Sequence, residues 1–570
     1  MPQLSKHWLV ASPASPEDER ELQNYHPILR QILCNRGYTT RSAAGQFLAA
    51  ASPSGTEPTH MLGVPQAVDR ILWAIDHHEL IAVYGDYDAD GVTATALLTQ
   101  TLQMLGASVR GYIPNRFDEG YGLNDDALDS LHAEGVRLII TVDCGIRSIQ
   151  EAVHAGNLGL DLIISDHHHP GSELPEVLAV INPKQPNDGY AEKDLAGVGL
   201  AYKLACALLE QAARRGKITG EIVETLDLVA IGTVADLAPL KGENRALVRA
   251  GLECIHRQQR QGLLSLIGVS GLKARAITAS DIGFGLGPRL NAAGRLESAQ
   301  AALSLMLTTD IFEAGHLAQK LEVQNRERQQ ITREIQADAE RMVLAENPDA
   351  LLLFAARPSY NPGVVGLAAS RLVEQYYRPA IVAQKGEEFT RGSCRSIPEF
   401  HITEALDQCT ELLEHHGGHA AAAGFTVRNQ NLPALLERLH AIAAEQLGWQ
   451  DLRPTLKADV ELPLSDLKPD LIGYLNLLQP TGYGNPQAYF VTRDVKVTNS
   501  RTVGKENAHL KLTVTDGRIT FDAIAFRQGH WQEQMPSRVD LMYTYELNEY
   551  NGRSFLQLNV RDLKPAGTPD

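Results

Sequence analysis

The chain has 570 residues, of which 44% are hydrophobic and 21% charged, and its formal net charge at pH 7 is −17. This length exceeds what one hydrophobic core accommodates, so we expect three or four domains. No apolar run approaches the roughly 20 residues of a membrane helix, and the opening MPQLSKHW lacks the apolar core of a signal peptide.

The six cysteines are scattered and form no CxxC pair. This pattern argues against a zinc ribbon or a disulfide framework and predicts reduced thiols in the cytoplasm. The negative net charge by itself counts against a nucleic-acid-binding protein, because such domains are usually basic. That objection weakens if many carboxylates gather at a metal site, since bound cations invert the local field.

Residues 1–55 are predicted to form short helices, and an α/β domain is predicted over 56–306. In this domain, short apolar runs alternate with helical stretches; the runs are 80–85, 137–143, 161–166 and 177–183. Such runs are typical of strands buried on both faces of a parallel sheet. Ligands of open α/β sheets bind beyond the carboxyl ends of the strands, which directs attention to those ends.

Three further segments complete the predicted organisation. Residues 307–347 carry no Gly or Pro after Gly315, and their sparse apolar residues predict an exposed connecting helix. Residues 348–452 contain strands of their own and Gly-rich loops, which predict a smaller α/β domain. Residues 453–570 show short alternating strands between polar turns, which predict a small antiparallel barrel or sandwich.

Acidic and imidazole side chains follow the predicted strands of the first sheet and one helix-like stretch. They are Asp86, Asp88, Asp90, Asp143, Asp166, His167, His168, His169 and Asp236. A single Asp is most often a helix cap or a turn residue. Together, however, these carboxylates would repel one another severely unless cations lay between them. Carboxylate and imidazole without thiolate favour Mn²⁺ or a similar ion, and the number of carboxylates favours two ions about 3.5–4 Å apart.

Four blocks, GDYDADGVTA, TVDCG, ISDHHHPG and GTVADLAPL, resemble in that order the motifs of the DHH phosphoesterase superfamily. Further blocks resemble the RecJ single-strand-specific exonuclease family; they are IPNRFDEGYGLN, LGPRLNAAGRLESA, RGSCRSIPEFHITEAL, HHGGHAAAAGFTV and PTGYGNPQAYF. The resemblance spans nearly the whole chain. It implies a parallel-sheet DHH domain, a long connecting helix, a smaller α/β DHHA1 domain and a C-terminal antiparallel β-barrel of the OB-fold type. It also implies 5′→3′ digestion of single-stranded DNA to mononucleotides with two Mn²⁺ or Mg²⁺ ions, in recombination and repair.

The resemblance also assigns roles to individual residues. It implies metal ligands at Asp88, Asp90, Asp143, His167 and Asp236, with Asp86 a ligand or a partner of one. Asp143 is expected to bridge both ions, and His168 to contact the phosphate and stabilise the transition state. Tyr84 departs from the pattern, because many members of the family have His there. His169 is not part of the DHH triplet, and we interpret it as a surface or supporting residue.

Arginines in predicted loops are candidate phosphate ligands, because a guanidinium matches phosphate oxygens bidentately; they are Arg116, Arg289, Arg295, Arg391 and Arg395. The alternative is a surface ion pair. The resemblance favours substrate binding by Arg295, Ser393 and Arg395, the last two as a pocket for the 5′ phosphate. Gly418 and His419, before an Ala-rich stretch, predict a helix start whose amides face an anion; the alternative is that the glycines only allow tight packing.

The C-terminal module carries aromatic residues among basic ones, which suits base stacking in a groove but equally suits a barrel core. These residues are Tyr483, Tyr489, Phe490, Lys496, Arg501, Lys505 and Lys511. The expected partners are single-stranded DNA, with a single-strand-binding protein and a helicase as further candidates, and no membrane. Two other functions compete. One is a DHH-type phosphodiesterase of short RNA oligonucleotides or cyclic dinucleotides, and the other is a binding scaffold that has lost its metal site.

Overall fold

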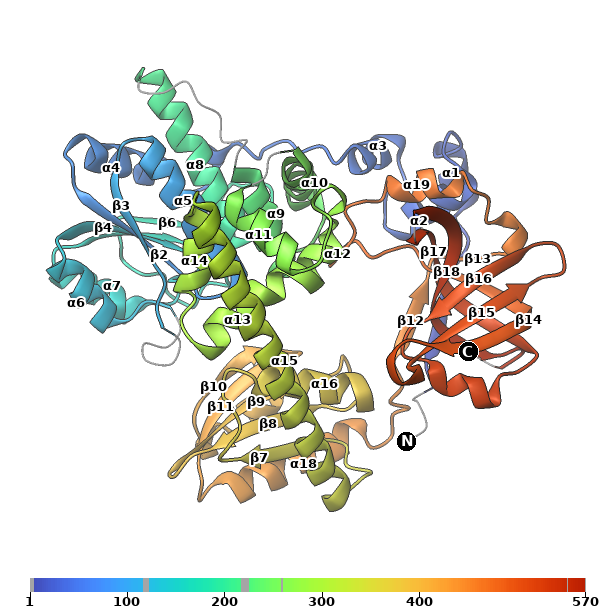
Figure 1. Ribbon diagram of the computed structural model, residues 1–570. Coiled ribbons are helices and arrows are strands. Elements are labelled where there is room, and N and C mark those ends of the chain that lie inside the picture. Colours follow the sequence, from blue (N-terminus) through green and yellow to red (C-terminus); the bar gives the residue numbers. More distant parts are fainter. Residues whose placement is uncertain (1–4, 116–121, 217–224, 258–259, 551, 569–570) are drawn as a thin grey trace. The chain divides into compact units, whose positions relative to one another are not determined.

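The computed structural model describes residues 5–115, 122–216, 225–257, 260–550 and 552–568 (Figure 1). The chain divides into two compact units. One comprises Trp8–Pro288, Ala302–Gly315 and Thr455–Asp570, and the other comprises Met1–His7, Arg289–Ala301 and His316–Pro454. No helix in the described part of the chain is both long and apolar enough to cross a membrane.

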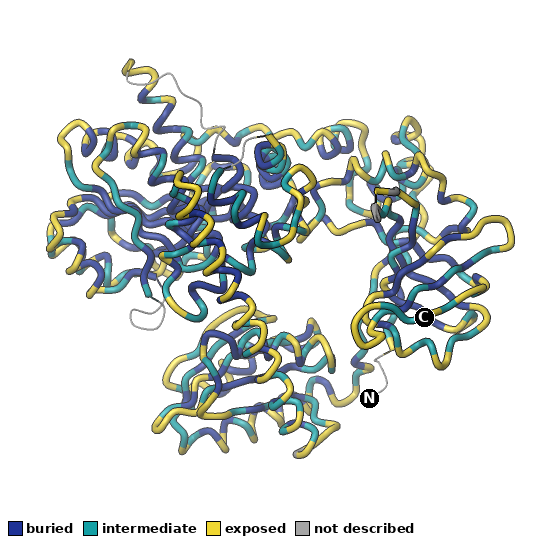
Figure 2. Tube along the Cα trace, in the orientation of Figure 1, coloured by how far each residue is buried: buried dark blue, intermediate teal, exposed yellow. Residues whose placement is uncertain are grey.

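The first unit contains the predicted parallel sheet. Its strands, in the order β3-β2-β4-β5-β6, are Ser108–Tyr112, Leu80–Gly85, Val136–Val142, Asp161–Ser165 and Ala179–Ile181, and every neighbouring pair is parallel. The inner strands are buried along almost their whole length (Figure 2). The edge strand β3 escaped prediction because its sequence, SVRGY, is half exposed and has no apolar run.

Helices cover both faces of this sheet. Helices α6 (Asp125–Ala133) and α7 (Ile149–Asn157) share a core with β2, β4 and β5 on one face. Helices α4 (Val64–Asp76), α5 (Ala89–Met104) and α8 (Gly197–Arg214) contact strands of the sheet, and α9 (Leu226–Ala235) packs on α5 and α8. The helices that follow are α10 (Gly242–Arg257), α11 (Gln261–Val269), α12 (Ala279–Asp281), α13 (Gly287–Leu296) and α14 (Gln300–Leu307).

The long helix α15 runs from Ile311 to Glu346. Much of the helix is exposed, as predicted, but one stripe of it is buried. Ile335, Ala339 and Val343 join the core of strands β7 (Leu353–Arg357) and β8 (Ala380–Lys385) and helix α16 (Val365–Tyr376). A few well-placed apolar residues therefore suffice to attach a charged helix to a domain.

The second unit contains a five-stranded sheet in the order β10-β11-β9-β8-β7, in which only β7 and β8 are parallel. Its remaining strands are β9 (Phe389–Arg395), β10 (Leu413–His419) and β11 (Ala422–Arg428). Its remaining helices are α17 (Ile402–Asp407) and α18 (Leu432–Leu447).

The helix predicted to start at Gly418 and His419 is absent, since these residues end strand β10 of a hairpin. Gly418 has φ +146°, and a Cβ there would lie 2.4 Å from the carbonyl oxygen of Ala422. The glycine thus serves the close approach of two strands. The Ala-rich stretch after it becomes β11, where cross-strand pairing overrides the helical propensity of alanine.

The C-terminal strands of the first unit form a closed barrel. Strands β14 (Phe490–Val503), β15 (His509–Thr515), β16 (Thr520–Ala525), β18 (Arg553–Pro565) and β17 (Arg538–Tyr550) follow one another around it, and β17 pairs again with β14. The short strand β13 (Val460–Glu461) pairs in parallel with the start of β14. This arrangement confirms the predicted antiparallel barrel, apart from the parallel pairs β16–β18 and β13–β14.

The N-terminal helices belong to this barrel rather than standing alone. Leu29, Ile32 and Leu33 of α2 (Pro27–Asn35) and Phe47 of α3 (Arg41–Ala49) lie in the same buried cluster as the barrel core. Strand β1 (His7–Val10) also pairs with β12 (Thr455–Ala458). Removal of the barrel alone would therefore expose the apolar face of the N-terminal helices.

Candidate metal centre and substrate-binding residues

The six predicted metal ligands meet beyond the carboxyl ends of the parallel strands. Asp86 follows β2, Asp88 caps the N-terminus of α5, Asp143 follows β4, and Asp236 caps the C-terminus of α9. Three sets of side chains have ligand atoms within 4.8 Å of one another. These sets are Asp86, Asp88 and Asp143; Asp90, His167 and Asp236; and Asp143, His167 and His168.

His167 lies at the centre of this cluster. Its Nε2 is 3.0 Å from Asp143 Oδ1, 3.7 Å from Asp236 Oδ2 and 4.0 Å from Asp90 Oδ2. Although His167 Nε2 and Asp143 Oδ1 lie 3.0 Å apart, they do not have the geometry of a hydrogen bond, and neither buried atom has another hydrogen-bond partner among the described residues. Buried polar atoms are nearly always satisfied in native proteins. Divalent cations would satisfy both atoms, so the residues present fit a metal centre.

The backbone around the cluster is locally strained. Asp143 has φ +64° and Leu237, directly after Asp236, has φ +60°. Such conformations are uncommon for residues other than glycine and gather at functional sites. Helix packing is also tight, because a Cβ on Gly197 would lie 2.7 Å from the Cβ of Asp143. These features hold the side chains close together at a cost in local stability.

Backbone amides fix the orientation of two of the carboxylates. Asp90 accepts hydrogen bonds from the amides of Gly197 (2.7 Å) and Val198 (2.8 Å) in the first turn of α8. Asp88 Oδ1 accepts from the amides of Asp90 (2.8 Å) and Gly91 (3.1 Å) at the start of α5. Helix N-termini favour negative charge, so both helices stabilise ionised carboxylates at this edge of the sheet.

Burial and mutual repulsion perturb the pKa values of the cluster. Burial raises the pKa of Asp90 and Asp143 well above the usual range, with neighbouring carboxylates adding to the effect, and raises the pKa of Asp236 to about 7. Burial, together with the neighbouring His168, lowers the pKa of His167 to about 3. The imidazole of His167 is therefore neutral at pH 7, the form that binds metal ions.

Asp166 orients His168, a role that was not predicted. Asp166 Oδ1 accepts a hydrogen bond from Nδ1 of His168 (2.7 Å) and another from its backbone amide (3.0 Å). The amide of Ile146 donates to Asp166 Oδ2 at 2.9 Å. Nε2 of His168 therefore faces away from Asp166. The sequence carries a signal for this contact, because an Asp side chain commonly accepts a hydrogen bond from the backbone amide two residues later, here that of His168.

Two side chains just after strand β6 form hydrogen bonds with the backbone of the turn that carries His167 and His168. Lys184 Nζ donates to the carbonyl oxygen of His167 (2.7 Å), and Asn182 Nδ2 donates to that of His168 (2.9 Å). No pattern in the sequence indicated these contacts, because they join segments about fifteen residues apart. The backbone of the turn is thus fixed on both sides of its two imidazoles.

Two further predicted positions lie beside the cluster. Tyr84 is buried, donates from its hydroxyl to Gly122 O (2.9 Å) and accepts from Asn124 Nδ2 (3.0 Å). Its hydroxyl therefore joins β2 to the residues just before α6. His169 is exposed, as expected of a surface residue. The predicted substrate ligand Arg116 lies outside the described residues.

The predicted phosphate ligands of the second unit gather at the start of helix α16. A Cβ on Gly366, in the first turn of α16, would lie 3.0 Å from Arg395 Nη2 and 3.6 Å from Ser393 Cβ. Arg295 Nη1 donates to the carbonyl oxygen of Gly363, just before the helix, at 3.2 Å. Two guanidinium groups, a hydroxyl and a helix N-terminus thus form an environment suited to an anion.

His419 lies on the same face of this sheet as Arg395. The register aligns His419 with Ala422 and Ala422 with Arg395 across neighbouring strands. Side chains directly opposite one another on neighbouring strands share a face of the sheet, and neighbouring strands lie about 5 Å apart. Only the small side chain of Ala422 separates the two across the neighbouring strands.

The prediction that the arginines lie in loops is wrong at all four positions that the structure describes. Arg289 and Arg295 lie in α13, and Arg391 and Arg395 lie in β9. Flanking Gly and Ser residues suggested loops, but here they allow close packing against neighbouring strands and helices. Arg289 forms an ion pair with Glu322 (2.7 Å), the alternative considered for this residue.

The aromatic residues near the barrel divide between core and surface. Phe490 is fully buried in the barrel core, and Tyr489 packs beside Trp8 in a smaller cluster. Tyr483 is 63% exposed and is the one of these three that is open to solvent. Of the predicted basic residues, Lys511 forms an ion pair with Asp522, with 3.4 Å between Nζ and Oδ2. Of these three aromatic residues, Tyr483 is therefore the one whose ring has most of its surface available for base stacking.

Comparison with known proteins places these features in a family. Family models match the chain at residues 80–233 (DHH family, N-terminal domain), 349–445 (DHHA1 domain) and 458–562 (RecJ OB domain). The single-stranded-DNA-specific exonuclease RecJ of Escherichia coli is 35% identical over 95% of this chain and 96% of its own length. That of Bacillus subtilis is 40% identical over 97% of this chain and 70% of its own length.

The chain belongs to the RecJ family.

Solved RecJ structures agree with this assignment. The crystal structure of RecJ from Thermus thermophilus in complex with Mn²⁺ superposes with a TM-score of 0.84 at 31% identity, over 99% of this chain and 80% of that one. The corresponding complex with Mg²⁺ gives a TM-score of 0.79 at 30% identity, over 99% and 79%. The predicted fold class is confirmed, and the exonuclease interpretation holds over that of an RNA or cyclic-dinucleotide phosphodiesterase.

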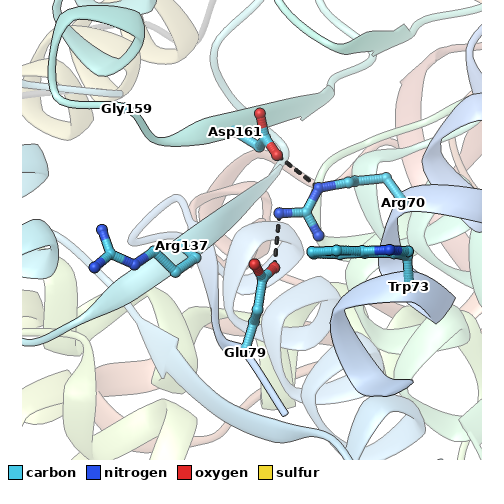
Figure 3. Close-up of a pocket in the computed structure, with 6 residues that line it drawn as sticks. All are labelled: Arg70, Trp73, Glu79, Arg137, Gly159 and Asp161. Atoms are coloured by element: carbon cyan, nitrogen blue, oxygen red, sulfur yellow. Dashed lines mark hydrogen bonds and ion pairs between the residues drawn. The ribbon is translucent and has the colours of Figure 1, made fainter. Parts of the chain in front are cut away.

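A surface pocket of about 480 Å³ lies at the opposite edge of the RecJ parallel sheet (Figure 3). Arg137 and Asp161 line it from the amino ends of β4 and β5. Arg70 bonds Asp161 (2.6 Å) and Glu79 (2.7 Å) and stacks on Trp73, with 4.9 Å from Cζ to the ring centroid. These ion pairs stabilise the sheet edge and take no part in the metal centre.

The raised pKa of Asp236 predicts a pH dependence of stability in the absence of metal ions. A carboxyl group whose pKa rises on folding binds protons more tightly in the folded state. The stabilisation that Asp236 gives the folded state is therefore fully present below the pKa of the unfolded chain, near 4. It is lost as the pH rises through the pKa of the folded state, about 7. In EDTA, the free energy of unfolding of wild type should fall over this window relative to that of Asp236→Asn.

Denaturant unfolding of both proteins at pH values from 5 to 8 measures the difference. Addition of Mn²⁺ should reverse the trend for wild type, because the cation favours the ionised carboxylate. Parallel pH profiles for wild type and Asp236→Asn in EDTA would contradict the assignment.

Proposed function

We propose that this chain is a 5′→3′ exonuclease that degrades single-stranded DNA to mononucleotides with two divalent cations, Mn²⁺ or Mg²⁺. The observation that carries the proposal is the convergence of Asp143 Oδ1 and His167 Nε2, two buried atoms that lack hydrogen bonds, among carboxylates within ligand distance. The names of the relatives, which specify single-stranded DNA, support the substrate.

The proposed ligands are Asp86, Asp88, Asp90, Asp143, His167 and Asp236. Divalent cations bound there would activate a nucleophile and stabilise charge on a scissile phosphate. The protein's own contribution is preorganisation. The amides at the starts of α5 and α8 fix Asp88 and Asp90, and the neutral imidazole of His167 offers its lone pair.

His168 is proposed to donate a hydrogen bond to a phosphate oxygen. Burial lowers the pKa of His168, but the hydrogen bond to Asp166 and the negative charges of Asp166, Asp236 and Asp86 together leave the pKa raised, which favours a donor at Nε2. A donor held in place before the reaction stabilises developing charge without reorganisation. Asp166 thus positions His168 and does not itself contact the substrate in this proposal.

The 5′→3′ direction of digestion is proposed to come from the second unit, where Ser393, Arg395 and Arg295 surround the start of α16. A terminal 5′ phosphate carries more charge than an internal phosphodiester, so a site rich in donors favours the end of the strand. His419 and Gly418 lie on the adjoining strand and are proposed to border the same site.

Domain boundaries and context complete the proposal. The family models fall within the proposed DHH domain (56–306), DHHA1 domain (348–452) and OB domain (453–570), with residues 307–347 as the connecting helix and 1–55 as an N-terminal helical segment. A cytoplasmic role in recombination and repair, beside a single-strand-binding protein and a helicase, is proposed from the family alone. All six cysteines are described and none forms a disulfide, which supports a reducing compartment.

Replacement of Asp143 by Ala should abolish hydrolysis. Its oxygens fall in two of the three ligand groups, so both ion positions lose a ligand at once. We expect the rate on 5′-phosphorylated single strands with Mn²⁺ to fall by at least about 10³-fold. The matched control is Asp129→Ala, which removes a carboxylate that pairs with His154 on the surface. Activity of Asp143→Ala within tenfold of the control would refute the ligand assignment.

Replacement of Arg395 by Ala should slow digestion of 5′-phosphorylated strands more than that of 5′-hydroxyl strands. Loss of a charged hydrogen bond costs about 1.5–3 kcal/mol, or roughly 10–150-fold in kcat/KM. The control is Arg438→Ala, an exposed arginine that pairs with Glu411 in the short turn after α17. Equal slowing on both kinds of end would show that Arg395 contacts the strand elsewhere.

A further inference from the structure

The segment Leu477–Asn485 leads to barrel strand β14 and is held by a single buried arginine. Arg245, in the first turn of α10, is 1% exposed. Its guanidinium donates five hydrogen bonds of 2.8–3.1 Å to five backbone carbonyl oxygens, those of Phe47, Leu477, Leu478, Gln479 and Pro480. The five N–H donors of an arginine are thereby all engaged.

The first turn of α10 provides a fixed base for this arginine. Glu243 accepts hydrogen bonds from Lys203 Nζ (2.8 Å) and from the hydroxyl of Tyr190 (2.5 Å), and all three side chains are buried. Asn244 Nδ2 donates to Asp194 O at 2.6 Å. These hydrogen bonds restrain the first turn of α10, so Arg245 starts from a well-defined position.

The other side of the segment contacts the turn that carries Asp236. The amide of Leu240 donates to the carbonyl oxygen of Tyr483 at 2.8 Å. The packing is close: a Cβ added to Gly484 would lie 3.0 Å from Pro239 Cβ, and one added to Gly482 would lie 2.8 Å from Leu240 Cδ1. Pro239 and Leu240 follow Asp236 within the same short turn between α9 and α10.

Internal bonds make the segment stiff. Asn485 Nδ2 donates to Leu478 O (2.9 Å) and Pro480 O (2.7 Å), which closes the segment on itself. Arg36 of the N-terminal region donates to Asn485 Oδ1 and to Pro486 O. We call Leu477–Asn485 the brace, since Arg245 and Arg36 hold it and it in turn contacts the turn Asp236–Leu240.

We propose that Arg245 is a positioning residue for the metal centre: through the brace, it holds the turn Asp236–Leu240 so that the Asp236 carboxylate faces the cation. The proposal rests on the proposed function of Asp236 as a metal ligand. The turn needs external support, because Leu237 has a left-handed backbone and Asp236 stands among carboxylates that repel it.

Arginine suits this position and lysine does not. The five carbonyl oxygens come from two separate segments, and only a planar fork with five donors reaches all of them. A lysine offers three donors on one atom, so Arg245→Lys should leave carbonyl oxygens of the brace without their bonds. The turn Asp236–Leu240 would then move more freely.

The test compares full-length Arg245→Lys with a matched control, Arg249→Met. Arg249 lies one turn further along α10 and donates to Leu48 O at 2.9 Å, so it contacts the N-terminal segment and not the brace. Isothermal titration with Mn²⁺ gives the affinity of the metal centre. We expect the Kd of the weaker ion to rise about 10–100-fold in Arg245→Lys, the range for loss of a residue that supports a ligand, and to stay within about twofold in the control.

Two further readouts separate positioning from mere loss of folded protein. Hydrogen exchange at the Leu240 amide should accelerate in Arg245→Lys, because its acceptor on Tyr483 becomes mobile. Excess Mn²⁺ should restore hydrolysis of a short single strand by this variant, which an unfolded fraction would not allow. Unchanged Mn²⁺ affinity in a folded Arg245→Lys would overturn the proposal.

A second variant covers the case in which Arg245→Lys does not fold. Arg36→Met loosens the opposite end of the brace and leaves Arg245 in place, and it should weaken Mn²⁺ binding in the same direction. Unchanged affinity in folded Arg36→Met would overturn the proposal in that case. Wild type that binds no Mn²⁺ would instead overturn the proposed function, so the two failures are distinguishable.

Discussion

Electrostatic repulsion among buried carboxylates is the constraint around which this RecJ-family chain is built. Asp90 and Asp143 are almost fully buried within a few ångströms of Asp86, Asp88 and Asp236. In low dielectric such charges cannot all be ionised without counter-charges. Cations supply the required charge, and helix N-termini supply part of it for Asp88 and Asp90. The burial of these carboxylates thus underlies both the packing of the fold around them and the requirement for cations.

The surrounding structure serves to hold these groups against their repulsion. Gly197 leaves room for Asp143, and the amides of α8 bind Asp90. Asp166 and Lys184 fix the histidine turn. The turn with Asp236 follows a helix rather than a strand and contacts the segment Leu477–Asn485, which lies more than two hundred residues later in the chain. The proposed role of Arg245 thereby extends the support of the metal centre to the segment that leads into the barrel.

Motifs predicted the centre of the site better than its supports. Residues that end strands, such as Asp143 and His167, could be placed together because parallel strands share one carboxyl edge. The roles of Arg245 and Lys184 depend on contacts between distant segments, which no local pattern encodes. Local signals also misled at Gly418, where strand pairing overrode an Ala-rich helix signal, and at Arg395, where flanking Ser and Gly suggested a loop.

The number of divalent ions bound per chain tests the central claim most directly. Metal-free protein is dialysed against increasing Mn²⁺, and bound metal is counted against protein concentration, with electron paramagnetic resonance to detect coupling between neighbouring ions. The account predicts two ions per chain at saturation, about 3.5–4 Å apart and therefore magnetically coupled. Full exonuclease activity with one ion per chain, or with none in EDTA, would contradict it.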